Sequence, residues 1–141
     1  MNRDEHFVEM AKLVASRSKD ASQVGAVIVD PKGRVISTGY NGFPRQMPDV
    51  PSLYADRPEK LSRIIHAEMN ALIFAHRDVE GCTLYTWPLL SCDRCIVHMI
   101  QAGMTRYVAS KCPDGWIERW ERSLERTRSY IVECGCTFLE L

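Results

Sequence analysis

Apolar residues recur at helical spacing near the beginning of the chain. Phe7, Met10, Ala11 and Val14 fall on one side of a helix, which predicts an amphipathic helix over residues 4–17. The apolar face of such a helix is expected to pack against another element of the fold.

The next apolar stretch is shorter and is bounded by turn residues. Val24 to Val29 is an apolar run, Asp30 to Gly33 is typical of a turn, and Arg34 to Gly39 resumes an extended pattern. These segments together predict a β-hairpin. Residues 41–62 contain four prolines and predict a long loop. Loops of this length in a compact domain are usually functional or mobile.

Helical and strand patterns alternate through the rest of the chain. The expected elements are a helix over 66–76, a strand from Thr83 to Trp87, a helix from Cys92 to Ala102 that Gly103 ends, a strand from Thr105 to Ala109, a charged amphipathic helix over 115–133 and a strand from Thr137 to Leu141. This order predicts an α/β fold in which helices flank a sheet.

Length, composition and charge narrow the class of protein. The 141 residues fit one compact domain, 1–141, and 45% hydrophobic residues are enough for a core. The 18 basic and 18 acidic residues balance, which argues against a protein that binds long nucleic acid but leaves room for a local phosphate pocket.

No apolar run approaches the roughly 20 residues that cross a membrane. Residues 1–11 lack a signal-peptide core, so we expect a cytoplasmic protein whose six cysteines are reduced.

Two short motifs carry candidate metal ligands. His66-Ala67-Glu68 begins one predicted helix, and Cys92-Asp93-Arg94-Cys95 begins another. The spacing of the two cysteines places both thiolates on one side of a helical turn, and the helix N-terminus favours the thiolate form. Zinc prefers nitrogen and sulfur ligands, and a catalytic site keeps one position open for water. We therefore expect one catalytic Zn²⁺ bound by His66, Cys92 and Cys95.

Glu68 lies two residues after the histidine and is the natural proton shuttle of such a site. Each part alone has an ordinary interpretation: a redox or structural cysteine pair, a core or surface histidine, a solvated glutamate. In this order they form the signature of zinc deaminases. The other cysteines and histidines have no comparable partners in the sequence.

Further segments extend this signature. The sequence resembles the deoxycytidylate (dCMP) deaminase family of the cytidine deaminase superfamily, over about residues 4–110. The resemblance rests on Ser18-Lys19-Asp20, Ser22-Gln23-Val24-Gly25-Ala26, Gly39-Tyr40-Asn41-Gly42-Phe43-Pro44, His66-Ala67-Glu68-Met69-Asn70-Ala71-Leu72, and Cys92-x-x-Cys95 running into Ile100-Gln101-Ala102-Gly103.

The resemblance implies a three-layer α-β-α fold with a five-stranded mixed sheet, and hydrolysis of dCMP to dUMP and ammonia in pyrimidine nucleotide metabolism. It also implies substrate contacts from the Asn41 side chain, the Ala67 N–H, the Ser91 carbonyl and Val24. Relatives are homo-oligomers, often hexamers, and the partner expected here is a small nucleotide rather than a membrane or a nucleic acid.

The sequence departs from the family at three points. Ser91 replaces the usual proline before the first cysteine, and the stretch before it carries one residue more than usual. Gln46 stands where many regulated members have glycine, which predicts weak or absent activation by dCTP, because a long side chain would crowd a nucleotide-binding loop.

Other functions stay open at this point. A cytidine or cytosine deaminase and a tRNA adenosine deaminase share the same superfamily. A non-catalytic zinc-binding module is the alternative of a different class, although such a site has no need of an unliganded carboxylate such as Glu68. The helix from Trp116 to Arg128 is interpreted as a solvated helix with buried aromatics, or alternatively as a subunit contact.

Overall fold

A mixed five-stranded sheet forms the centre of the molecule. The computed structural model describes residues 1–141, and the strand order is β2-β1-β3-β4-β5. Strand β1 is antiparallel to β2 and β3, whereas β3, β4 and β5 run parallel. The strands are β1 (Gly25–Val29), β2 (Val35–Tyr40), β3 (Thr83–Trp87), β4 (Arg106–Ala109) and β5 (Thr137–Glu140). The expected mixed sheet is confirmed.

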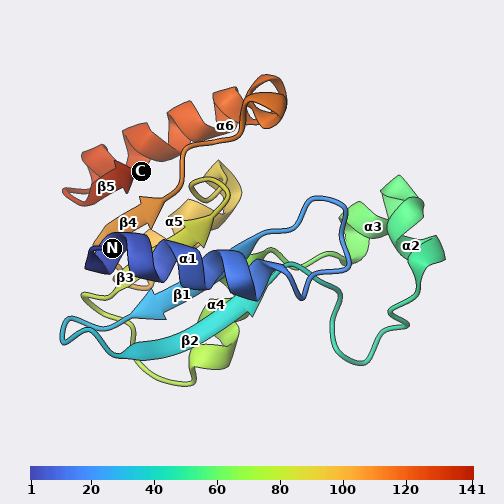
Figure 1. The fold of residues 1–141 in the computed structure, drawn as a ribbon, viewed down its shortest axis with the longest axis horizontal. Helices are drawn as coiled ribbons and strands as arrows, with labels where there is room; N and C mark the ends of the chain where they lie inside the picture. The colour runs from blue at the N-terminus through green and yellow to red at the C-terminus, as the bar shows by residue number, and fades with distance from the viewer.

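Helices cover both faces of this sheet, and the two termini lie at the same end of the molecule (Figure 1). Helix α1 packs on one face, and three helices pack on the other. The long helices are α1 (Arg3–Ala15), α4 (Ala67–Ala75), α5 (Asp93–Gln101) and α6 (Asp114–Glu133). These three layers are the α-β-α arrangement that the sequence resemblance implied.

Strand β1 shows why the two faces need helices. Side chains of a strand alternate between the faces of a sheet. Val27 and Val29 face the cluster that contains Phe7 of α1, while Ala26 and Ile28 face the larger cluster beneath α4, α5 and α6. All five residues of β1 are buried. A continuous apolar run in the sequence therefore marks a strand that is covered on both sides.

The prediction of a loop over residues 41–62 is wrong for the second half of this range. Two short helices, α2 (Pro51–Ala55) and α3 (Arg57–Arg63), occupy it. Pro51 and Pro58 lie in the first turns of these helices, where a missing N–H costs no helical hydrogen bond. Asp56 caps α3 by accepting a hydrogen bond from the Glu59 N–H. The other predicted elements end within about two residues of the observed bounds.

Helix α4 lies unusually close to strand β2. A Cβ added at Gly39 would overlap the backbone oxygen of Ala67 and lie 2.5 Å from the backbone nitrogen of Ala71. This close approach holds α4, and with it the His66-Ala67-Glu68 motif, against the sheet. Glycine at this position is therefore required by packing.

We expect Gly39→Ala to lower the free energy of unfolding by about 1–3 kcal/mol, because the helix must move away from the sheet. Urea denaturation measures this change. Gly115→Ala is the matched control: a Cβ there meets nothing within 4 Å, and alanine favours the helical turn it joins. Equal stability of the two variants would contradict the packing argument.

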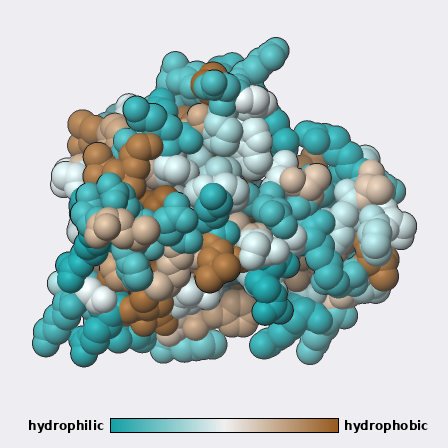
Figure 2. Space-filling view, in the orientation of Figure 1, coloured by the Kyte–Doolittle hydropathy of each residue, from teal (hydrophilic) through white to brown (hydrophobic).

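None of the helices is both long and apolar enough to span a bilayer. Hydrophilic residues cover most of the face seen in Figure 2, with hydrophobic ones in small separate groups. Two of the exposed apolar side chains, Ile73 and Phe74, are neighbours on α4.

Candidate active site

Three side chains from two segments that are distant in sequence meet where helices α4 and α5 begin. His66 is the N-cap residue of α4, and Cys92 is the N-cap residue of α5, with Cys95 in the first turn. Neither N-cap side chain bonds its own helix, so both are free to face one another. His66 Nδ1 lies 3.5 Å from Cys92 Sγ and 3.2 Å from Cys95 Sγ.

These separations suit one tetrahedral zinc ion. All three ligand atoms lie within 4.8 Å of one another. Typical Zn–N and Zn–S bond lengths at tetrahedral angles place nitrogen and sulfur about 3.6 Å apart. Hydrogen bonds from Cys95 and His66 also lower the pKa of the Cys92 thiol, which favours a thiolate ligand. The expected ligand set is thus brought together, and it fits the one zinc ion per chain that the sequence predicts.

Glu68 lies beside this group without belonging to it. Its side chain is buried, with a relative exposure of 4%, and it lines the same pocket as His66 and Cys92. Burial raises the pKa of its carboxyl above the ordinary value. Glu68 is a buried carboxyl that is not one of the candidate metal ligands. Such a group is expected to carry protons in a zinc site with three protein ligands.

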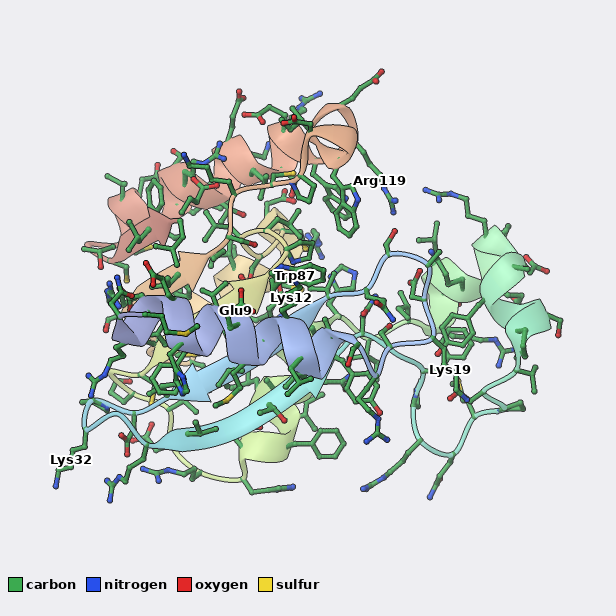
Figure 3. The ribbon with its side chains drawn as sticks, viewed as in Figure 1. Glu9, Lys12, Lys19, Lys32, Trp87 and Arg119 are labelled. Carbon is green, nitrogen blue, oxygen red and sulfur yellow. The ribbon has the colours of Figure 1, made fainter.

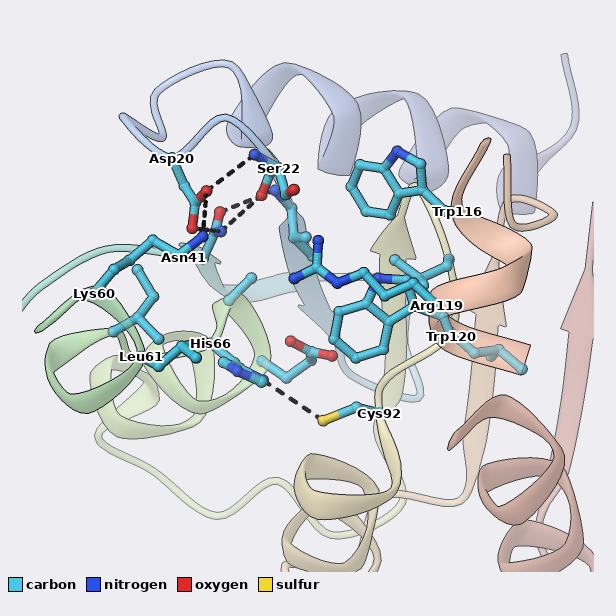
Figure 4. A pocket seen from close by; sticks show the side chains of 16 residues that line it. Asp20, Ser22, Asn41, Lys60, Leu61, His66, Cys92, Trp116, Arg119 and Trp120 are labelled. Atoms are coloured by element: carbon cyan, nitrogen blue, oxygen red, sulfur yellow. Dashed lines mark hydrogen bonds and ion pairs between the residues drawn. The ribbon is translucent and has the colours of Figure 1, made fainter. Parts of the chain in front are cut away.

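The pocket extends from these residues to the beginning of strand β1 (Figure 4). Three of the expected substrate-contact residues, Asn41, Ala67 and Val24, line it. The Asn41 side chain holds the wall together: its Oδ1 accepts a hydrogen bond from the Val24 N–H at 2.9 Å, and its Nδ2 donates to the Ser22 carbonyl at 2.8 Å. Asn41 Oδ1 keeps one lone pair for a ligand.

Ser91 lies apart from the pocket wall. It is buried, and its carbonyl accepts a hydrogen bond from Thr127 Oγ1 of α6 at 2.7 Å. Leu89 and Leu90 line the pocket instead. Thr127 therefore fixes the segment that leads into Cys92, and the Ser91 substrate contact remains a prediction.

Helix α6 and helix α3 supply pocket residues that the sequence analysis missed. From α6 come Trp116, Arg119 and Trp120, and from α3 come Lys60 and Leu61. The helix from Trp116 to Arg128 was interpreted as solvated or as a subunit contact, and neither interpretation placed it at the site. The tryptophans at i and i+4 on a charged helix were the available signal, because they mark one buried face.

A second hollow opens beside the 41–50 segment. Its cationic lining residues are Arg17, Lys19 and Arg45, and Lys19 is paired with Asp49 at 2.8 Å. Gln46 is exposed, has no positive φ and does not line this hollow. The weak or absent activation by dCTP that Gln46 predicts stays a prediction.

Comparisons with known proteins agree with this site. Residues 1–111 match the model of the cytidine and deoxycytidylate deaminase zinc-binding region. The chain is 35% identical to an uncharacterised deaminase of Aliivibrio fischeri, over 92% of this chain and 86% of that protein. It is 37% identical to human deoxycytidylate deaminase, over 74% of this chain but only 62% of the human protein.

Solved structures share the fold. The dCMP deaminase of cyanophage S-TIM5, in its apo form, superposes with a TM-score of 0.72 at 20% identity, covering 98% of this chain and 96% of the phage chain. At that identity the likeness concerns the fold. It confirms the helix-flanked mixed sheet described above.

Proposed function

This chain belongs to the cytidine and deoxycytidylate deaminase zinc-binding family, and we propose that it is a zinc-dependent hydrolase that converts dCMP to dUMP and ammonia. The observation that carries the proposal is the three-ligand group His66, Cys92 and Cys95 with the buried, unliganded Glu68 in the same pocket. A purely structural zinc site would use a fourth protein ligand and would not need this carboxyl.

The mechanism follows from the positions of these residues. His66, Cys92 and Cys95 would hold the zinc ion, which when bound would supply a water whose pKa is lowered to about 7. The Glu68 carboxylate accepts a proton from the attacking water and passes it to the ring nitrogen of the cytosine. The water oxygen forms a bond to the carbon that bears the amino group. Glu68 then accepts the second proton from the added oxygen and delivers it to the amino nitrogen; the C–N bond breaks, ammonia leaves and the oxygen becomes the uracil carbonyl oxygen.

Pocket walls orient the base for this attack. The N–H groups in the first turn of α4 have no partner within the helix, and Ala67 provides one of them next to Glu68. That N–H is suited to the pyrimidine carbonyl oxygen. Leu89 and Leu90 offer an apolar wall, which excludes water from the base. A buried hydrogen bond such as the one from the Ala67 N–H discriminates between bases better than the fit to an apolar wall does.

We expect dCMP to have a higher kcat/KM than deoxycytidine by about 10-fold or more, because each charge-assisted hydrogen bond to a phosphate stabilises the complex by about 1.5–3 kcal/mol. An ammonia-release assay with dCMP, CMP, deoxycytidine, cytosine and a tRNA substrate measures the preference. A kcat/KM for deoxycytidine equal to that for dCMP would replace the nucleotide deaminase with a nucleoside deaminase.

The remaining expectations are part of the same proposal. Residues 1–141 act as a single nucleotide deaminase domain in the cytoplasm, where its free cysteines stay reduced. The protein forms a homo-oligomer, and the exposed Ile73 and Phe74 on α4 are apolar surface that a second copy would cover.

A further inference from the structure

Arg119 projects from helix α6 into the pocket that holds the candidate metal ligands. It lines this pocket together with His66 and Glu68, although the family match ends at residue 111. Figure 3 shows its side chain leaving α6 toward the side of the molecule where α2 and α3 lie, and Figure 4 shows the guanidinium turned toward Ser22. The guanidinium thus points across the pocket toward the segment that leads into β1.

The positive charge of Arg119 has no carboxylate partner. None of the salt bridges in the chain includes it. Lys60, the other lining residue with a permanent positive charge, is neutralised by Asp20, whose Oδ1 lies 3.2 Å from Lys60 Nζ. The side chains of this pair are only 13% and 5% exposed, so the pair is largely withdrawn from solvent. Of the arginine and lysine side chains that line the pocket, Arg119 is therefore the one left without a carboxylate partner.

Arg119 is exposed, and one contact with the neighbouring Trp120 orients its guanidinium. Its guanidinium carbon lies 5.0 Å from the centre of the Trp120 ring, a cation–π contact. Trp116 and Trp120 pack against the main core and anchor this part of α6. The indole N–H of Trp120 is buried and has no hydrogen-bond partner. Anchoring reduces the conformational entropy that Arg119 loses when it binds a ligand.

We propose that Arg119 binds the 5′-phosphate of the nucleotide substrate and so makes this site select nucleotides over nucleosides. The inference rests on the proposed function. A guanidinium donates two parallel hydrogen bonds to phosphate oxygens, and it remains charged at every working pH. The phosphate would lie at the mouth of the pocket while the base reaches Glu68. Selection for the phosphate is then carried by α6, outside the segment that the family model covers.

The test compares Arg119→Gln with Arg122→Gln. Both residues are exposed and both variants remove one positive charge from α6, but Arg122 does not line the pocket. In Arg119→Gln, the ratio of kcat/KM for dCMP to that for deoxycytidine should fall about 10- to 100-fold. Arg119→Lys should retain part of this ratio, because it keeps the charge but loses the two-pronged geometry. Arg122→Gln should leave the ratio unchanged.

A binding measurement separates this inference from the proposed reaction. Titration calorimetry with dUMP and with deoxyuridine gives the contribution of the phosphate without any turnover. Weaker binding of dUMP alone in Arg119→Gln supports the inference even if dCMP proves not to be the substrate. If the wild type prefers dCMP and Arg119→Gln keeps both the kinetic ratio and the dUMP affinity, the phosphate binds elsewhere and the inference is wrong. An equal loss for both ligands would also overturn it.

Discussion

Replacing Glu68 with glutamine should leave the protein folded and loaded with zinc, while kcat for dCMP falls about 10²- to 10⁴-fold. Glutamine has nearly the same shape as glutamate but cannot accept the proton of the attacking water. Glu68 does not belong to the metal-ligand group, so its replacement removes no ligand. Steady-state kinetics and metal analysis on the same preparation measure the two effects together.

The relative changes in kcat and KM identify the role of Glu68. A residue that moves protons lowers kcat much more than it raises KM, since the substrate still binds. Glu9→Gln on the exposed surface of α1 makes the same chemical change away from the pocket and should have wild-type kinetics. A Glu68→Gln enzyme with near wild-type kcat would remove this residue from the mechanism.

Replacing Cys92 with alanine should reduce the zinc content from about one per chain to a small fraction and abolish deamination. The remaining His66 and Cys95 leave only two ligands, which is too few for a catalytic zinc site. Cys134→Ala removes an exposed cysteine outside the group and should keep both zinc and activity.

Metal analysis of the purified variants, before any zinc is added, measures this prediction. Full zinc occupancy in Cys92→Ala would show that the ion is held by other residues and would contradict the ligand assignment. Zinc lost from Cys134→Ala as well would indicate general unfolding, which circular dichroism of both variants detects independently.

The grouping of the candidate metal ligands with Glu68 could be predicted from sequence because these residues belong to local motifs. His66 and Glu68 lie at the beginning of one helix, and Cys92 and Cys95 at the beginning of another. Apolar periodicity places those helices within about two residues. Zinc chemistry then requires the two motifs to meet.

The pocket walls depend on tertiary packing, which local patterns do not report. Arg119 looks like any charged residue of an amphipathic helix until α6 is placed beside α5. Thr127 of α6 donates a hydrogen bond to the Ser91 carbonyl, a contact between distant segments that no local pattern predicts, and the substrate contact expected of this carbonyl stays a prediction. The helices α2 and α3 were missed because prolines were weighed as loop residues, although both lie in first helical turns.

The central claim is that this site hydrolyses dCMP with zinc and Glu68. Incubation of the zinc-loaded protein with dCMP in water enriched in heavy oxygen tests it most directly. Mass spectrometry of the nucleotide and an assay for ammonia follow the reaction. The account predicts equal amounts of ammonia and dUMP, with one labelled oxygen in each dUMP, and almost none of either with Glu68→Gln. Recovery of unchanged dCMP from the zinc-loaded wild-type protein would contradict it.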